Sequence, residues 1–303
     1  MKKIYIFLFS LLFTITSALA GEKIIVLNTG SNNGTMFGQA NAYVEDLKAL
    51  GYDAELVSPG EAVKAIAILN SIPKNQPVLV NIDSTSMAKI AAGSVKGVKP
   101  LYVKDKDLIL AYRDHFYVCT NTFNDNTKAF FEKGASFKVA VGNPAGLWKK
   151  VMDDLNKENG TAHQSVTYDG GGKTRAGIIN KEVDFGFVTT NHTFALEAKG
   201  VKCFAEFTDG KKLRYDTTVD ELSAGKNKFF VGFATGYALK NADAKLVKQL
   251  RSDLSKLFDN PNSAIVKLHG GKAPVQNYGW EESISTRVKW VNNAIDDWAV
   301  YLK

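Results

Sequence analysis

The chain has 303 residues and 45% hydrophobic side chains, enough to bury the core of one large domain or of two smaller ones. Its formal net charge of +7 favours anionic partners. The lysines and arginines are scattered, however, and form no dense basic stretch with interleaved aromatic residues, so we expect no nucleic acid among the partners.

The N-terminus has the pattern of a secretory signal peptide. Lys2 and Lys3 precede an apolar run over residues 4–15 and a stretch of small residues over 16–20, which predicts cleavage before Gly21 and export to the periplasm. The run is shorter than the roughly 20 residues that span a bilayer, and no later segment is long and apolar enough to do so. No cysteine stands at the cleavage point, so we expect no lipid anchor.

Only two cysteines are present, Cys119 and Cys203. Export would place them in an oxidising compartment, where one disulfide can form. Two buried thiols that pack as small apolar side chains are an equally good interpretation.

From Lys23 onward, short apolar runs alternate with segments of helical period, which is typical of an α/β protein with largely parallel sheets. Residues 24–27 are predicted to form a strand. Residues 28–35 form a loop of small polar residues, and apolar residues then recur every three or four positions as far as Gly51, which predicts a helix.

The same unit recurs three times. Residues 78–82, 137–141 and 184–188 are predicted strands, and each opens into a loop of small and polar residues. In open α/β sheets, ligands bind beyond the carboxyl ends of the strands, where helices that begin there present free N–H groups. The loops therefore predict an anion site built from backbone donors and hydroxyl groups, with no arginine required.

Residues 168–174 (Tyr-Asp-Gly-Gly-Gly-Lys-Thr) lack the spacing of a phosphate-binding loop. They predict a tight turn from a strand into a helix, whose first N–H groups could still contact an anion. Beyond them, apolar stripes over 246–257 and 284–302 predict two long helices that pack on the protein's own core rather than on a partner.

Catalytic and metal-binding motifs are missing from the sequence. It has no G-x-S-x-G, H-E-x-x-H, P-loop or C-x-x-C pattern, and its four histidines lack the spacing of metal ligands, so we expect no cofactor, no metal and no enzymatic activity. His192 lies eight residues after Asp184 and could form a base with an orienting carboxylate, but such a pair is more often a loop or pocket contact.

The order of these motifs resembles a known family. The loop that ends in Gly34-Thr35, the strand and hydroxyl loop over 80–85, the Tyr-x-Gly-Gly segment from Tyr168 and the Val-Asp strand over 183–187 follow one another as in the extracytoplasmic substrate-binding proteins of tripartite tricarboxylate transporters. The later layout is similar too, with residues 230–239, the helix around Leu246, the break at 259–261 and the glycine pair at 270–271 in order.

The resemblance implies a type II periplasmic-binding fold, in which two α/β lobes, each a mostly parallel sheet flanked by helices, close over a solute. The crossing strands would fall near residues 116–120 and 203–208. Lobe 1 would then comprise residues 21–118 and 206–303, and lobe 2 residues 119–205. Because the two cysteines lie on the implied crossing strands, the resemblance favours the disulfide without establishing it.

The sequence also departs from the family. Residues 30–36 (Gly-Ser-Asn-Asn-Gly-Thr-Met) are poorer in alanine and glycine than the usual first loop, and residues 142–146 form a shortened second loop. Lys173 and Arg175 stand where the family is generally uncharged. These departures leave the binding mode in place and indicate a different solute.

The leading hypothesis is a periplasmic solute-binding protein that captures a small organic anion, expected to be a carboxylate, for integral-membrane permease subunits. Its ligand would receive neutral hydrogen bonds from both lobes. The candidate ligand-binding residues are Thr29, Ser31, Asn32, Asn33, Gly34, Thr35, Ser84, Thr85, Ser86, Asn143, Ala145, Gly146, Tyr168, Thr190 and Asn191. Two alternatives stay open: a binding protein of an ABC importer or for a phosphorus or sulfur oxyanion, and a secreted hydrolase or transferase.

Overall fold

The computed structural model describes residues 21–32, 34–142, 147–208, 212, 214–223, 233–271 and 282–303. The expected signal peptide lies outside this part of the chain. So do four of the candidate ligand-binding residues, Asn33, Asn143, Ala145 and Gly146.

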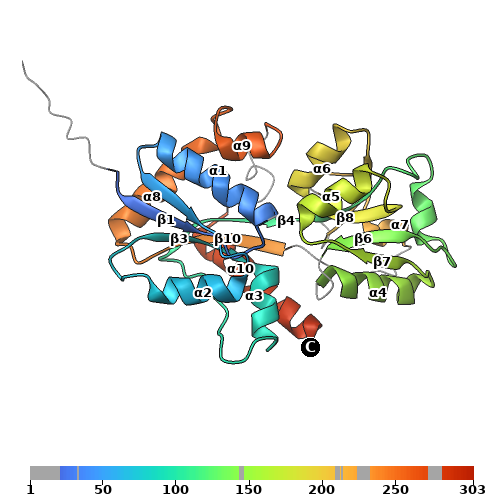
Figure 1. Cartoon of the computed structure of the whole chain (residues 1–303), viewed down its shortest axis with the longest axis horizontal. Helices are drawn as coiled ribbons and strands as arrows, with labels where there is room; N and C mark the ends of the chain where they lie inside the picture. Colours follow the sequence, from blue (N-terminus) through green and yellow to red (C-terminus); the bar gives the residue numbers. More distant parts are fainter. Residues whose placement is uncertain are drawn as a thin grey trace, which may run out of the picture.

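The first lobe is a five-stranded sheet in the order β2-β1-β3-β10-β4 (Figure 1). Its strands are β1 (Lys23–Leu27), β2 (Asp53–Val57), β3 (Val78–Asp83), β4 (Leu108–Asp114) and β10 (Phe233–Lys240). Its helices are α1 (Thr35–Ala49), α2 (Ala62–Ser71), α3 (Ser84–Ala91), α8 (Ala244–Leu257), α9 (Ala264–Leu268) and α10 (Ile284–Leu302). Strands β1, β2 and β3 are parallel, and β10 is antiparallel to its neighbours.

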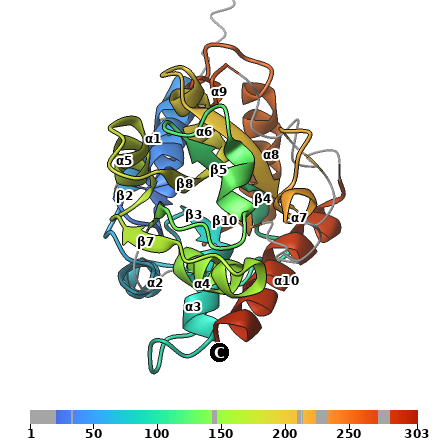
Figure 2. The same cartoon turned by 90° about the vertical axis from the view of Figure 1, so that its right-hand side faces the viewer.

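The second lobe, which lies in front in Figure 2, is a five-stranded sheet in the order β7-β6-β8-β5-β9. Its strands are β5 (Phe116–Thr120), β6 (Lys138–Gly142), β7 (Gln164–Thr167), β8 (Phe185–Thr189) and β9 (Lys202–Phe207). Its helices are the 3-10 helix η1 (Thr127–Phe131), α4 (Leu147–Asn159), α5 (Gly171–Ile179), α6 (Thr190–Glu197) and α7 (Val219–Leu222).

The central strands explain why the sequence forms these sheets. Every residue of β3 and of β8 is buried, as expected for parallel strands that helices cover on both faces. The strands predicted over 24–27, 78–82, 137–141 and 184–188 are confirmed to within one residue at each end as β1, β3, β6 and β8. The α/β class with two lobes is therefore confirmed.

The chain crosses between the sheets at His115, which separates β4 from β5. His115 is buried, and its Nδ1 lies 3.5 Å from a carboxylate oxygen of the buried Glu206 on β9. Glu206 also forms a bridge with Thr218, and α7 packs on β9, so the described residues between Glu206 and Ser223 belong with the second sheet. All of β5 lies in that sheet as well, so both crossings differ from the division expected at 118/119 and 205/206.

Helix α10 connects the two lobes at one edge. It packs on α3, β4 and β10 of the first lobe through the apolar stripe read from the sequence. Its last turn reaches α4 of the second lobe, where Lys150 Nζ donates to the carbonyl of Tyr301 at 2.6 Å and the rings of Trp148 and Trp298 lie 6.4 Å apart. Among the described helices, none is both long and apolar enough to cross a membrane.

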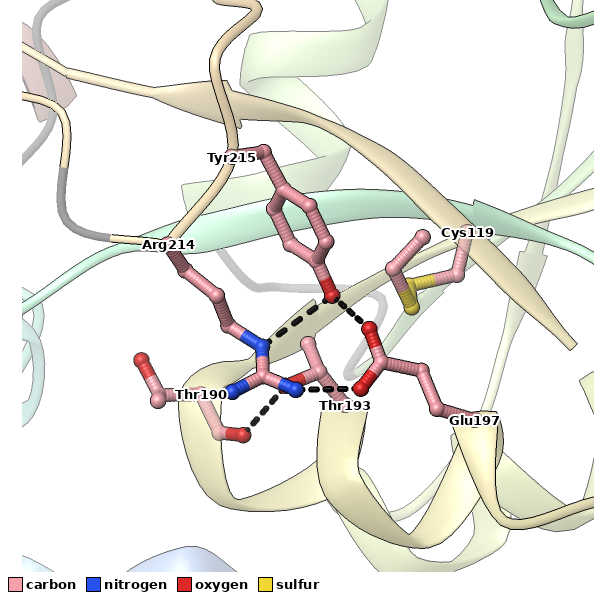
Figure 3. Close-up of a disulfide and its surroundings, with 7 residues drawn as sticks. Cys119, Thr190, Thr193, Glu197, Arg214 and Tyr215 are labelled. Carbon is pink, nitrogen blue, oxygen red and sulfur yellow. Dashed lines mark hydrogen bonds and ion pairs between the residues drawn. A yellow bond between two sulfur atoms is a disulfide. The ribbon is translucent and has the colours of Figure 1, made fainter. Parts of the chain in front are cut away.

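The structure joins Cys119 and Cys203 by a disulfide (Figure 3). The two residues face each other on the neighbouring strands β5 and β9, and both are buried. The bond therefore ties together the two strands of the second sheet that lie next to the crossings.

We expect reduction of this disulfide to destabilise the protein, because the bond closes a loop with a sequence separation of 84. A native disulfide of this kind contributes about 2–4 kcal/mol. Urea unfolding of the oxidised protein and of a Cys119→Ala/Cys203→Ala variant measures the difference. Intact mass should show two hydrogens fewer in the oxidised protein, and equal unfolding midpoints would contradict a stabilising role.

Candidate functional site

A cavity of about 220 Å³ lies between the two lobes, and we refer to it as the central cavity. Four loops at strand ends and the first turns of several helices line it. The described residues that line it are Gly30, Ser31, Gly34, Thr35, Met36, Asp83, Thr85, Ser86, Phe116, Val141, Gly142, Trp148, Gly170, Gly171, Thr174, Phe187, Val188, Thr189 and His192.

The strand order brings these loops together. Strands β1 and β3 run parallel in one sheet, and β6 and β8 run parallel in the other. Parallel strands end at the same edge of a sheet, so the loops after all four strands open toward the space between the lobes. This is the convergence that the repeated pattern of strand and small polar loop predicted.

Three helices point uncapped N-termini at the central cavity. The N-cap residues of α1, α5 and α6 are Gly34, Gly170 and Thr189, and in none of them does a side chain cap the helix. None of the three helices has an acidic residue in its first turn. Gly170 has a φ of 89°, which favours glycine and lets the chain turn sharply into α5. Free N–H groups and the positive ends of three helix dipoles therefore meet in one place.

Helix α3 differs from these three because Asp83 caps it. The Asp83 carboxylate accepts hydrogen bonds from the N–H groups of Thr85 and Ser86 at 3.3 and 3.0 Å. It also accepts from their hydroxyl groups, at 2.8 Å from Thr85 and 2.6 Å from Ser86. The hydroxyl loop after β3 is therefore organised around a carboxylate of the protein itself.

Thr35 at the start of α1 contacts the second lobe directly. Its Oγ1 lies 3.1 Å from Thr189 Oγ1, 3.2 Å from His192 Nε2 and 3.4 Å from Asn191 Oδ1. Every donor finds an acceptor when His192 Nε2–H donates to Thr35, Thr35 donates to Thr189, and Thr189 donates to Asn191 at 2.7 Å. These contacts hold the lobes together across the site.

His192 is a neutral side chain at the centre of this contact. Burial, together with the nearby positive charge of Arg175, lowers its pKa from the ordinary 6.5 to about 4. A Cβ atom at Gly171 would lie only 2.3 Å from His192 Nε2, so this close approach of α5 to α6 requires glycine. In the described part of the chain, the buried His192 Nδ1 has no hydrogen-bond partner.

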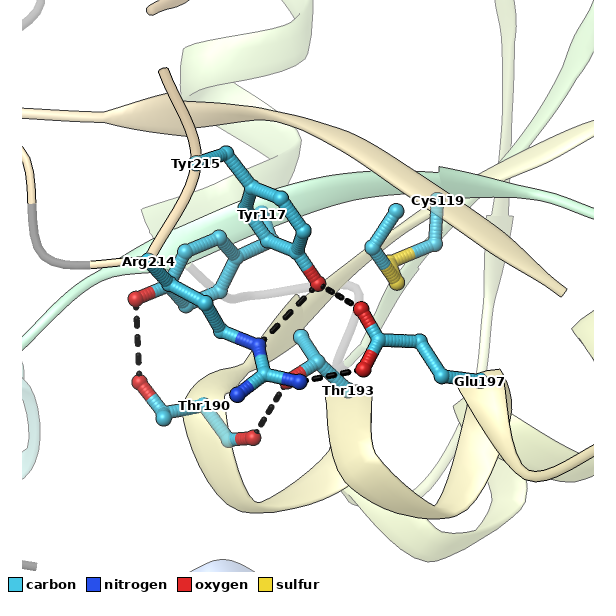
Figure 4. A network of polar contacts seen from close by, with 8 residues as sticks. Tyr117, Cys119, Thr190, Thr193, Glu197, Arg214 and Tyr215 are labelled. Atoms are coloured by element: carbon cyan, nitrogen blue, oxygen red, sulfur yellow. Dashed lines mark hydrogen bonds and ion pairs between the residues drawn. A yellow bond between two sulfur atoms is a disulfide. The ribbon is translucent and has the colours of Figure 1, made fainter. Parts of the chain in front are cut away.

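Contacts on its far side hold α6 in position. Thr190 Oγ1 donates to the hydroxyl of the buried Tyr117 at 3.2 Å (Figure 4). The guanidinium of Arg214 lies 3.8 Å from the centre of the Phe194 ring and pairs with Glu197, which also accepts from the Tyr215 hydroxyl (Figure 4). The disulfide lies beside the same network (Figure 3), so a covalent bond and several polar contacts surround the helix whose N-terminus faces the cavity.

A second cavity of about 450 Å³, the outer cavity, adjoins the central one and shares Gly34, Thr35 and His192 with it. Arg175 on α5 and Lys267 on α9 line it from opposite lobes. No aspartate or glutamate is among the described residues that line it. The outer cavity therefore places two positive charges beside the central one.

No family model matches the sequence, and no curated protein matches it significantly. Its structure, in contrast, matches solved structures over nearly the whole chain. The chain has the two-lobed fold of periplasmic solute-binding proteins.

One such neighbour is MatC from Rhodopseudomonas palustris with bound malate, which is 16% identical, has a TM-score of 0.63 and matches over 94% of this chain and 100% of its own. A second, Rpa4515 from R. palustris with adipate, is 14% identical, with a TM-score of 0.64 over 93% of this chain and 96% of its own. A TctC solute-binding protein from Polaromonas is 14% identical, with a TM-score of 0.58 over 92% and 96%.

Five of the candidate ligand-binding residues lie in the wall of the central cavity: Ser31, Gly34, Thr35, Thr85 and Ser86. Asn191 lies beside it, in the wall of the outer cavity, and its side-chain oxygen accepts a hydrogen bond from the Thr189 hydroxyl. The loop after β1 and the loop after β3 therefore reach the cavity as expected.

Five other candidates lie outside the central cavity because their polar groups bond elsewhere. Thr29 bonds the side chain and carbonyl of Asn81, and Asn32 accepts from Ser58. Ser84 accepts from the N–H of Ala234, Tyr168 donates to Glu182 at 3.0 Å, and Thr190 donates to Tyr117. These side chains stabilise the surrounding loops and strands, and they do not line the central cavity.

Several cavity residues were not anticipated. Asp83 has a signal in the sequence, because an Asp directly before Ser-Thr-Ser at a predicted strand end is a typical N-cap. Phe116, Trp148 and Phe187 form an apolar wall, and nothing in their local sequence distinguishes them from core residues. The Asp184 carboxylate accepts from the N–H of Lys138 instead of orienting His192, so the imagined base and carboxylate pair is not formed.

We expect acid to destabilise the protein partly through His192. Unfolded histidine binds a proton near pH 6.5, whereas the folded one does so only near pH 4, so stability present above pH 6.5 is lost as the pH falls through this window. The loss reaches about 3 kcal/mol for such a shift. Urea unfolding between pH 7 and 4.5 should show a smaller loss for His192→Gln than for the wild type; identical losses would contradict the assignment.

Proposed function

We propose that this chain is a periplasmic solute-binding protein that captures a small organic carboxylate between its lobes and delivers it to a membrane permease. The observation that carries the proposal is the convergence of three uncapped helix N-termini, those of α1, α5 and α6, on one cavity between the lobes. Such N-termini bind anions through free N–H groups and the helix dipole.

The central cavity suits an oxyanion that is held by neutral donors. No lysine or arginine is among its described lining residues, and the hydroxyl group of Ser31 accompanies the helix N–H groups. A carboxylate that leaves water must have its oxygens paired with donors, and several backbone N–H groups accomplish this without a counter-ion.

The apolar wall indicates a ligand with a carbon skeleton. Met36, Phe116, Trp148 and Phe187 line the same cavity as the donors, and the rings of Phe116 and Trp148 are stacked with centroids 3.5 Å apart. An inorganic oxyanion would leave this surface without a partner. A small organic acid would cover it and so gain from the burial of apolar area.

The comparisons support this assignment. MatC was solved with malate and Rpa4515 with adipate, and both share the fold of this chain over nearly its whole length. The N-terminal signal pattern and the disulfide both agree with an exported protein. These observations support the proposal of a periplasmic protein that captures solute for a transporter of the tripartite tricarboxylate type.

We expect a thermal-shift screen of residues 21–303 to identify the ligand class. A ligand at 100 times its Kd adds about 2.7 kcal/mol of stability, which raises the Tm by several degrees in a protein of this size. Mono-, di- and tricarboxylates should include a stabilising compound, with sulfate and phosphate as controls. A panel in which only the inorganic anions stabilise the protein would overturn the carboxylate assignment.

We expect Thr189→Asp to weaken binding of the compound found in that screen by about tenfold or more, because a carboxylate at this N-cap competes with the ligand for the N–H groups of α6. The matched control is Ser283→Asp, which makes the same kind of change at the N-cap of α10, where Ser283 accepts from the N–H of Thr286. Calorimetry should show unchanged affinity for the control. Equal affinity in both variants would exclude α6 from the anion site.

A further inference from the structure

Asp83 places a carboxylate in the wall of the central cavity, and its side chain is only partly satisfied by the protein. Its Oδ2 atom accepts three hydrogen bonds, from Thr85 Oγ1, Ser86 N and Ser86 Oγ, at 2.8, 3.0 and 2.6 Å. From the described part of the chain, its Oδ1 atom accepts only one, from Thr85 N at the longer distance of 3.3 Å. Asp83 Oδ1 therefore retains capacity for a further donor.

No cation of the described chain neutralises Asp83 by an ion pair. Burial lowers the pKa of Lys89, which lies on the same helix, and the charge of Asp83 partly offsets that lowering. The two side chains nevertheless form no ion pair. The residue is 7% exposed, so solvent screens it weakly. A negative charge of the protein thus faces the same small cavity as the three helix N-termini.

This arrangement discriminates between solutes. A simple carboxylate held by the N-termini of α1, α5 and α6 would lie in a cavity of about 220 Å³ with Asp83 in its wall, and like charges this close repel each other. A solute that carries a hydrogen-bond donor next to its carboxylate exchanges that repulsion for a hydrogen bond to Oδ1.

We propose that Asp83 is a specificity-determining residue that selects solutes bearing a hydroxyl or ammonium group beside the captured carboxylate, that is, hydroxy or amino carboxylates. The inference rests on the proposed function, and it names the class of carboxylate that this chain binds. Ser86 and Thr85 fix the orientation of Asp83, because their donors hold Oδ2 at the start of α3 and leave Oδ1 for the solute.

Substitution of Asp83 by asparagine reverses the hydrogen-bonding character at this point. Asparagine is as good an N-cap as aspartate, and its single carbonyl oxygen must take the place of Oδ2 to receive three of the four donors of α3, so that only the long bond from Thr85 N is lost. The NH₂ group then takes the place of Oδ1. The variant presents a donor where the wild type presents an acceptor, so it should favour a keto group over a hydroxyl group.

Calorimetry with two matched sets of acids tests the inference. Succinate, malate and aspartate differ only at one carbon, and 2-hydroxyglutarate and 2-oxoglutarate differ only in hydroxyl against keto. We expect the wild type to bind malate or aspartate about tenfold more tightly than succinate, the better of the two showing whether hydroxyl or ammonium is recognised. In Asp83→Asn this preference should vanish, and the ratio of affinities for 2-oxoglutarate and 2-hydroxyglutarate should shift toward the keto acid.

The matched control is Asp243→Asn, which changes the N-cap of α8, where Asp243 accepts from the N–H of Leu246 at 2.8 Å, and should leave all affinities unchanged. Circular dichroism verifies that both variants fold. Binding of all the acids with no preference in wild type and Asp83→Asn alike would overturn the role of Asp83 while leaving solute capture intact. Binding of none of these acids by the wild type would count against both the inference and the proposed capture of short carboxylates.

Discussion

The proposed function depends on one constraint: a carboxylate that leaves water must have its oxygens paired with hydrogen-bond donors. Helix N-termini supply such donors only if nothing else caps them. The sequence leaves Gly34, Gly170 and Thr189 at the starts of α1, α5 and α6, where their side chains do not cap the helix. Elsewhere, α3, α7, α8, α9 and α10 all carry side-chain caps. Of the described helices that begin at the central cavity, α1, α5 and α6 leave their N-termini uncapped, whereas α3 is capped by Asp83. Helix α2 also lacks a side-chain cap, but it begins outside this cavity.

Much of the fold could be predicted from the sequence because its signals are local. Parallel strands and ligand-binding loops could be predicted from the buried runs of β3 and β8 and from the polar loops that follow them, because these patterns need no long-range information. The lobe boundaries were harder to predict from the sequence, because Glu206 and Thr218 form a β-bridge that no local sequence pattern indicates. The first crossing therefore falls a few residues before the position that the resemblance implies, whereas the second follows Ser223, well beyond the expected division at 205/206.

The site was predicted in part for the same reason. Loop residues such as Thr35 and Ser86 line the cavity, as expected from their place after strand ends. Thr190 follows a strand end too, yet its hydroxyl turns back to Tyr117 of a neighbouring strand, and only the tertiary structure decides between the two directions. The apolar wall could not be predicted either, because Trp148 reaches the cavity only through the stacking of its ring on Phe116 of β5.

The two edges of the space between the lobes differ in their contacts and charge, and this difference bears on the rate at which the proposed solute would associate. Figure 1 shows α10 and α4 at one edge and α1, α5, α6 and α9 at the other, and the last turn of α10 is bonded to α4. The other edge borders the outer cavity, which holds Arg175 and Lys267. A solute arriving there meets a positive potential, which accelerates the encounter with anions and weakens as the ionic strength rises. Salt should thus slow association while the dissociation rate, governed by the neutral donors inside, stays nearly constant.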